Sequence, residues 1–93
     1  MPKVKYVIQT IYNIEGVDVR FIKYGKEVQS EDSLPANYKA VRAMKNSSNV
    51  SDLQSRISKQ FPGYRFAVFD ADGNKARGNM LLGNLRDTYY DED

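Results

Sequence analysis

Apolar and polar residues alternate along the first part of the chain, which is the pattern of β-strands. Residues 3–12 are rich in the β-branched and aromatic residues that strands prefer, and their alternate positions form one face: Val4, Tyr6, Ile8, Thr10 and Tyr12. A turn at 13–16 leads into a second alternating segment at 17–22. The pattern predicts an N-terminal antiparallel hairpin, with a short third strand at 27–29 after a tight turn at Gly25 and Lys26.

Helical spacing of apolar residues replaces this alternation in the middle of the chain. Pro35 suits the start of a helix that would end near Lys45, and its apolar stripe would consist of Leu34, Tyr38, Val41 and Met44. A second helix is predicted over 51–61, where Ser51-x-x-Gln54 has the form of a capping box and Pro62-Gly63 ends the pattern. Its apolar stripe would be Val50, Leu53, Ile57 and Phe61.

The segment YRFAVF at 64–69 is apolar on both faces, which predicts a strand in the interior of a sheet. Asp72-Gly73 follows it and predicts a hairpin turn, after which Lys75 and Arg77 would point to the same side of the sheet. A helix over 80–90, with Asn79 as its N-cap, is expected at the end of the chain. Gly83 weakens that helix by about 1 kcal/mol relative to alanine, so a strand through 79–85 stays open as an alternative.

These elements together predict an α+β domain, in which one antiparallel sheet packs against two or three helices in the order ββααββα. The sheet would consist of the N-terminal hairpin and a second hairpin around Asp72-Gly73. The chain has 93 residues, which is one domain's length, and we expect residues 1–90 to form it. The acidic residues 91–93 are expected to form a frayed tail.

The stretch FDADGNKARGN at 69–79 has the residue types of a metal site or a phosphate-binding loop. Counted from Asp70, an EF-hand loop would need glycine at its sixth position and glutamate at its twelfth, but Lys75 and Leu81 stand there. Gly73 and Gly78 likewise lack the Gly-Lys-Ser/Thr ending of a Walker loop. A solvated turn is the favoured interpretation, and no metal or other cofactor is expected.

The amino-acid composition excludes several kinds of catalytic and metal-binding site. The chain has no histidine and no cysteine, which excludes imidazole and thiolate metal ligands and every Ser-His or Cys-His catalytic pair. We therefore expect a protein that is not an enzyme. No apolar run approaches the ~18 residues of a membrane span, and the N-terminus lacks the core of a signal peptide. Together with the absence of cysteine, this predicts a cytoplasmic location without membrane contact.

The charge is unevenly distributed. Residues 33–86 contain nine basic and three acidic side chains, although the net charge of the whole chain is only +2. Basic residues would flank the apolar stripes of both central helices and follow the Asp72-Gly73 turn: Lys39, Arg42, Lys45, Arg56, Lys59, Lys75 and Arg77. Such a flank could neutralise phosphates, so an RNA- or DNA-binding protein is one hypothesis. No RRM, KH or zinc-finger motif accompanies it.

A second hypothesis is a module that binds a partner protein. Tyrosine and arginine are enriched at the centres of protein interfaces, and the pattern does not require burial of Tyr12, Tyr24 or Tyr90. Separate basic and acidic blocks with nearly balanced charge also suit a specific partner or self-association. We favour this hypothesis: a small regulator or inhibitor, of the kind that viruses make against host proteins, with nucleic-acid binding as the alternative.

Overall fold

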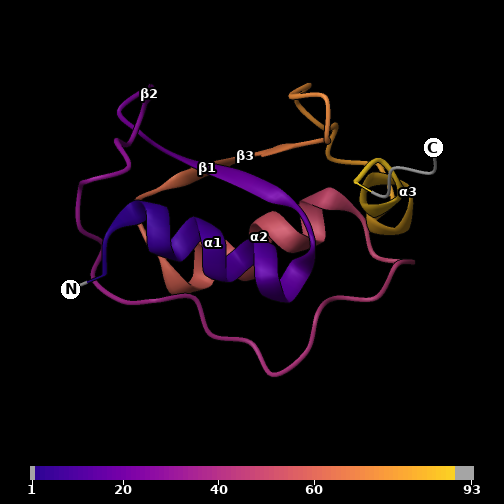
Figure 1. Cartoon of the computed structure of the whole chain (residues 1–93), viewed down its shortest axis with the longest axis horizontal. Coiled ribbons are helices and arrows are strands. Elements are labelled where there is room, and N and C mark those ends of the chain that lie inside the picture. Colours follow the sequence, from indigo (N-terminus) through magenta and orange to yellow (C-terminus); the bar gives the residue numbers. More distant parts are fainter. Residues whose placement is uncertain (1, 90–93) are drawn as a thin grey trace.

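The computed structural model describes residues 2–89, which form one three-stranded antiparallel sheet and three helices. In chain order the elements are α1 (Val4–Glu15), β1 (Asp18–Lys23), β2 (Lys26–Glu27), α2 (Val50–Gln60), β3 (Arg65–Phe69) and α3 (Leu82–Asp87). Figure 1 shows α1 and α2 beneath the sheet and α3 at one end of it. The predicted α+β class with one antiparallel sheet is confirmed. Tyr90 and the predicted tail at 91–93 lie outside the described residues.

The sheet has the strand order β2-β1-β3, so β1 is the central strand. Phe21 pairs with Phe66 and Val19 with Val68, and these side chains face the helices. The rings of Phe21 and Phe66 meet edge to face with their centroids 4.8 Å apart. The predicted strand at 64–69 is thus confirmed, but its predicted interior position is wrong, because β3 lies at the edge of the sheet.

The N-terminal strand predicted at 3–12 is wrong, because residues 4–12 belong to helix α1 and Lys3 is its N-cap. Val4, Val7 and Ile11 are fully buried, and their spacing of three and four residues forms one helical face against the sheet. Gly16, with a φ of 79°, ends the helix and donates its N–H to the Tyr12 carbonyl. Burial of this stripe outweighs the weak preference of β-branched residues for strands.

The first hairpin therefore joins β1 to β2. Its turn lies at Tyr24 and Gly25, both with positive φ, one residue before the predicted turn at Gly25 and Lys26. This pair of positive φ angles matches the right-handed twist of the two strands. Strand β2 covers Lys26–Glu27 instead of the predicted 27–29.

The helix predicted between Pro35 and Lys45 does not form, and residues 28–49 are a long connection without helix or strand. Leu34 and Tyr38 of the predicted stripe are buried, but Val41 is fully exposed. Side chains from the helices hold the backbone of this connection in place of helical hydrogen bonds. The Gln60 carboxamide accepts from the Lys39 N–H at 2.8 Å and donates to the Lys39 carbonyl at 2.7 Å.

Helix α2 confirms the prediction for 51–61, with a different cap. Asn49 and Asp52 form the capping box, in which each side chain accepts from the other residue's N–H. The predicted cap at Ser51 and Gln54 is wrong. Gln54 instead donates from Nε2 to the Phe66 carbonyl of β3, at 2.9 Å.

The turn at Asp72-Gly73 is present, with Gly73 at a φ of 86°. The outgoing strand predicted after it does not form among the described residues, where only one isolated bridge joins Phe69 to Lys75. Helix α3 is shorter than the helix predicted over 80–90. Its N-cap is Leu81 instead of the predicted Asn79. It is a helix, so the alternative of a strand through 79–85 is excluded.

Candidate functional site

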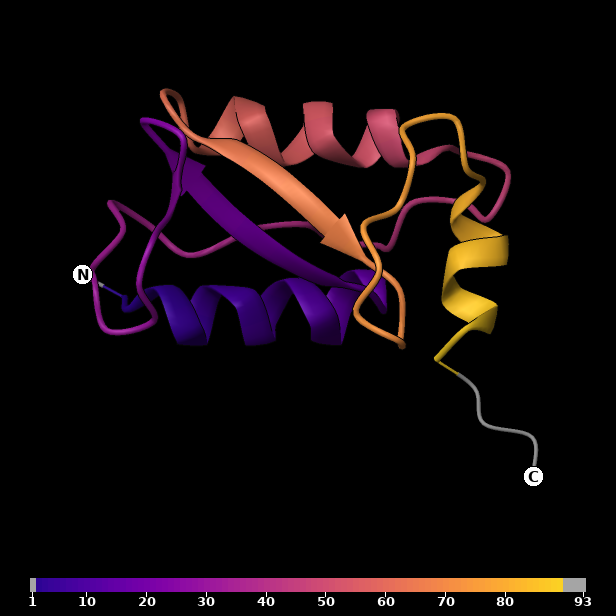
Figure 2. The same cartoon turned by 90° about the horizontal axis from the view of Figure 1, so that it is seen from above.

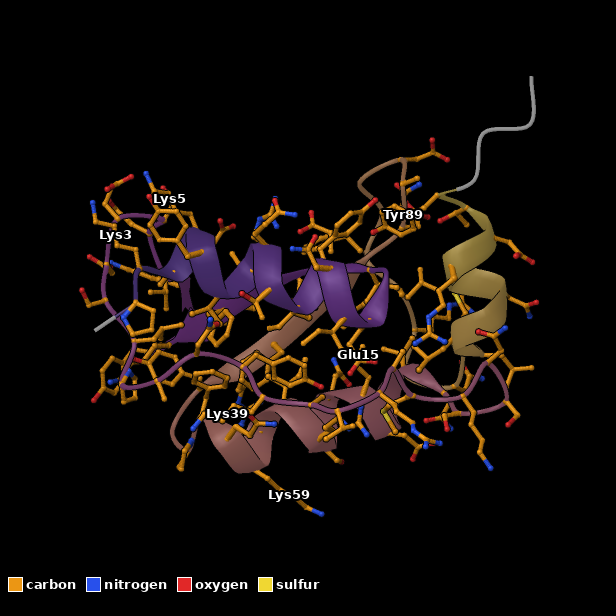
Figure 3. The ribbon with its side chains drawn as sticks, turned by 60° about the horizontal axis from the view of Figure 1, so that its bottom comes forward. Lys3, Lys5, Glu15, Lys39, Lys59 and Tyr89 are labelled. Carbon is orange, nitrogen blue, oxygen red and sulfur yellow. The ribbon has the colours of Figure 1, made fainter. Side chains whose placement is uncertain are left out.

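Glu15 is the only charged residue among residues 2–89 that is buried, and its side chain is not exposed to solvent. It lies at the end of α1 (Figure 3). One carboxylate oxygen, Oε2, accepts from the Tyr38 hydroxyl at 2.6 Å and from Arg56 Nη1 at 2.8 Å. The other, Oε1, accepts from the Met44 N–H at 2.9 Å and lies 3.4 Å from Arg86 Nη2. The Glu15 carboxylate thus joins the long connection, α2 and α3 to α1.

These contacts use the full hydrogen-bonding capacity of the Glu15 carboxylate. Within residues 2–89, no buried side-chain nitrogen or oxygen lacks a partner. Burial, together with the hydrogen bond to Glu15, raises the pKa of the Tyr38 hydroxyl, which keeps its proton in the folded protein. A carboxylate with two arginine partners and no free lone pair is suited to holding the fold together, not to proton transfer.

Sequence reasoning missed this cluster, because Glu15 appeared only as part of the turn at 13–16. Its partner Arg86 lies 71 residues further along the chain. No local spacing links the two residues. A single charged residue at the buried end of an amphipathic helix would have been the only signal, and it requires the helix to be recognised first.

The structure brings part of the predicted basic flank together. Lys39 and Arg42 lie on the connection beside α2, which contributes Lys59 (Figure 3). We call Lys39, Arg42 and Lys59, which are all exposed, the basic cluster. Arg56 lies next to it but binds Glu15 and the Arg42 carbonyl, so its charge is already compensated. Lys45 is exposed further along the same connection.

The other two predicted basic residues lie elsewhere. Lys75 and Arg77 flank Ala76, whose N–H binds the Val68 carbonyl at 2.7 Å, and both side chains are exposed. Figure 1 shows this loop above the sheet, while the connection carrying Lys39 and Arg42 runs beneath the helices. The predicted basic residues therefore form two groups on opposite sides of the molecule.

The predicted tyrosines do not form one patch either. Tyr12 lies on α1 with its ring centroid 5.7 Å from that of Tyr89, and 40% of Tyr12 is exposed. Tyr24 lies at the β1–β2 turn and is 92% exposed. That turn is at the opposite end of the sheet from α3, which precedes Tyr89 (Figure 1).

The sheet has a second face, which no helix among the described residues covers (Figure 1). The strand register places three rows of residues on this open face: Ile22 beside Arg65, Arg20 beside Ala67, and Asp18 beside Phe69. Arg20 lies 2.6 Å from Asp18 and 3.7 Å from Glu27. Arg65 is exposed and forms no ion pair within residues 2–89.

Asp70, where the comparison with an EF-hand loop began, and Asp72 both belong to the turn. Asp70 Oδ1 accepts from the N–H groups of Asp72 and Asn74, both at 2.9 Å. Across residues 2–89 there is no group of three potential metal-ligating side chains.

No described helix has the length and apolar character to cross a membrane. No protein-family model, curated protein or solved structure matches this chain.

Proposed function

We propose that this protein is a non-enzymatic module that docks on a partner protein through the open face of its sheet. One observation carries this proposal: β3 is apolar on both faces, yet α1 and α2 cover only one of them. Ile22 and Phe69, which are both partly exposed, lie on the uncovered side, where Ala67 is only 3% exposed. Apolar side chains on an uncovered sheet face are typical of a surface that a partner completes.

The charges around these apolar residues also support protein docking. Arg65 is exposed beside Ile22, and an arginine next to apolar side chains is common at the centre of protein interfaces. Arg20, Asp18 and Glu27 already compensate one another, which would limit indiscriminate binding of polyanions. A cytoplasmic regulator or inhibitor, including one of viral type, is the role that we propose for such a module.

The test is a pull-down from the source organism's lysate with the tagged protein, with half of the sample treated with nuclease. We expect a protein to survive the nuclease and to be lost with Ile22→Glu or Arg65→Glu. Lys45→Glu, which changes an exposed charge away from the sheet, should bind as the wild type does. If only nucleic acid is recovered, or if the open-face variants bind normally, the proposal fails.

The basic cluster supports a second candidate function, the binding of RNA or DNA. Gln60 and Arg56 of α2 bind the backbone of Lys39 and Arg42, so the segment that carries these two residues runs along the helix that carries Lys59. Three lysine or arginine contacts to phosphate would give a log-log salt slope of about −2 to −3. Lys39→Glu combined with Arg42→Glu should abolish that binding. A wild-type affinity for single-stranded RNA and duplex DNA that does not change with salt would exclude this candidate.

A further inference from the structure

The outer edge of β3 borders a groove against α2 of about 440 Å³. Figure 2 shows this strand and helix side by side when the molecule is seen from above the sheet. The groove is lined by residues of α2, of β3 and of the segment just before β3: Ser51, Gln54, Ser55, Ser58, Tyr64, Arg65 and Phe66. None of these seven residues is acidic.

The backbone of Phe66 faces this groove. The Phe21 carbonyl points toward β2, where it accepts from the Val28 N–H at 2.8 Å, so Phe21 and Phe66 exchange no hydrogen bonds. The N–H and the carbonyl of Phe66 therefore point away from β1. No acceptor for the Phe66 N–H is present among residues 2–89.

The Phe66 carbonyl is occupied by a side chain instead of a strand. Gln54 Nε2 donates to it at 2.9 Å, so a carboxamide stands where the peptide N–H of a neighbouring strand would lie. A glutamine side chain can rotate away from this position at the cost of one hydrogen bond. The outer edge of β3 thus already binds an amide group at the Phe66 carbonyl. The Phe66 N–H is a donor on the same side of the strand.

We propose that this groove binds an extended, acidic peptide segment of the partner protein, which adds as a fourth strand to the edge of β3. This inference rests on the proposed function, because the segment would belong to the docked partner. Main-chain hydrogen bonds to Phe66 supply the attachment, as in other cases of strand addition. Ala76 already binds the Val68 carbonyl, so the added strand is short and centred on Phe66.

Charge and side-chain size define the preferred segment. Arg65 is the only charged residue among the seven that line the groove, and it forms no ion pair within residues 2–89. Two serines of α2, at 55 and 58, leave room for side chains of a strand and offer hydroxyl groups, whereas Ser51 lies against Gly78. A segment that alternates acidic and β-branched residues meets both conditions. A second copy of this chain does not, because it would bring two Arg65 side chains to one short stretch without an acidic residue in the lining.

The test uses the full chain labelled with ¹⁵N and two pools of acetylated, amidated peptides. One pool alternates Asp or Glu with Val, Ile or Thr, and the matched pool replaces the acidic residues with Lys or Arg. We expect the acidic pool to shift the amide resonances of Ser55, Ser58 and Phe66 and to slow hydrogen exchange of the Phe66 N–H. The basic pool should do neither.

Substitutions then separate strand addition from adventitious contact. Gln54→Ala removes the competing carboxamide, so affinity for the acidic pool should rise about threefold to tenfold, the worth of one hydrogen bond. Arg65→Glu and Ser58→Tyr should each lower the affinity for the acidic pool by at least the same factor. Arg65→Glu reverses the charge of the groove, and Ser58→Tyr fills it. Lys59→Glu reverses an exposed charge of α2 that does not line the groove, and it should change affinity less than Arg65→Glu.

Several outcomes would overturn the inference. They are equal binding of the two pools, shifts confined to the open face, or an unchanged or weaker affinity of Gln54→Ala. A Phe66 N–H that becomes protected with increasing protein concentration alone, together with a doubled mass, would show pairing with a second copy instead. If the pull-down still recovers a protein, each of these results contradicts the peptide groove but not the docking function. A pull-down that recovers nucleic acid alone contradicts both.

Discussion

Arg86 donates from Nε to the carbonyl oxygen of Glu15 at 2.7 Å, and its Nη2 lies 3.4 Å from Oε1 of the same residue. The same guanidinium also donates from Nη1 to the Met44 carbonyl and to Asn46 Oδ1, each at 2.7 Å. One side chain of α3 therefore binds the end of α1 and the last part of the long connection. The stability of the fold depends on this polar cluster as well as on the apolar core.

Removal of the Glu15 carboxylate should be strongly destabilising. Glu15→Ala leaves the Tyr38 hydroxyl and the Met44 N–H without their acceptor and removes the carboxylate partner of Arg56 and Arg86. Breaking a buried ion pair costs about 3–5 kcal/mol. A small domain has only about 5–15 kcal/mol of stability, so urea unfolding should shift substantially. Glu31→Ala, at an exposed carboxylate that pairs with Lys3 and Lys5, serves as the control and should shift the urea midpoint much less than Glu15→Ala does. An equal effect of the two substitutions would contradict this role of Glu15.

Alkaline pH should destabilise the protein partly through Tyr38. Burial, first, and the hydrogen bond to Glu15 raise the pKa of its hydroxyl above the usual value near 10. The unfolded chain loses this proton near pH 10 while the folded chain keeps it, so stability is full below about pH 10 and falls as the pH rises further. Urea midpoints between about pH 8 and pH 11 should fall less for Tyr38→Phe than for the wild type. Tyr6→Phe, at a ring that is 58% exposed, should follow the wild-type curve, and a Tyr38→Phe curve of wild-type slope would contradict the argument.

Gly83→Ala should destabilise the protein although alanine is the better helix former. A Cβ at position 83 would lie 2.8 Å from the Cβ of Asn46 and 3.3 Å from its carbonyl oxygen, which accepts the Gly83 N–H at 3.0 Å. The overpacking should cost about 1–3 kcal/mol. Asn84→Ala, at the exposed neighbouring position of α3, should be neutral or slightly stabilising. Thermal unfolding of the two variants would compare them, and a more stable Gly83→Ala variant would show that the connection can move away.

Tyr24→Asn should stabilise the β1–β2 turn. Tyr24 has a φ of 53°, a left-handed conformation that costs a residue with Cβ about 1–2 kcal/mol, whereas Asn-Gly is the preferred pair for such turns. We expect the free energy of unfolding to rise by about 1 kcal/mol. If Tyr24 contacts the partner, the same variant should bind it more weakly despite its greater stability. An unchanged or lower stability in denaturant unfolding would show that the tyrosine is not strained.

The elements that the sequence predicted correctly are those whose local signals agree with their packing. Helix α2 has a single apolar stripe and a clear stop, and β3 has no helical alternative for its short apolar run. Residues 3–12 differ because their apolar positions satisfy both periods: Val4, Tyr6 and Ile8 for a strand, or Val4, Val7 and Ile11 for a helix. Only the sheet above α1 decides between them, and no local pattern contains that information.

The candidate sites were predicted to different degrees. The apolar character of both faces of β3 was visible in the sequence, but it indicated an interior strand where the structure has an edge strand with an uncovered face. The predicted basic flank assigned Lys39 and Arg42 to one helix and Lys59 to the next, but the helix expected to carry the first two does not form. The binding role of these residues and of the tyrosines stays a prediction.

The order of the strands has a consequence for synthesis on the ribosome. The central strand β1 pairs with β3 from Asp18, opposite Phe69, to Ile22, opposite Arg65. While the ribosome is still making the connection and α2, the nascent β1 has no long strand to pair with, and Glu15 has neither arginine partner. We therefore expect productive folding to wait until β3 and Arg86 have left the exit tunnel, with apolar side chains of the N-terminal half exposed until then.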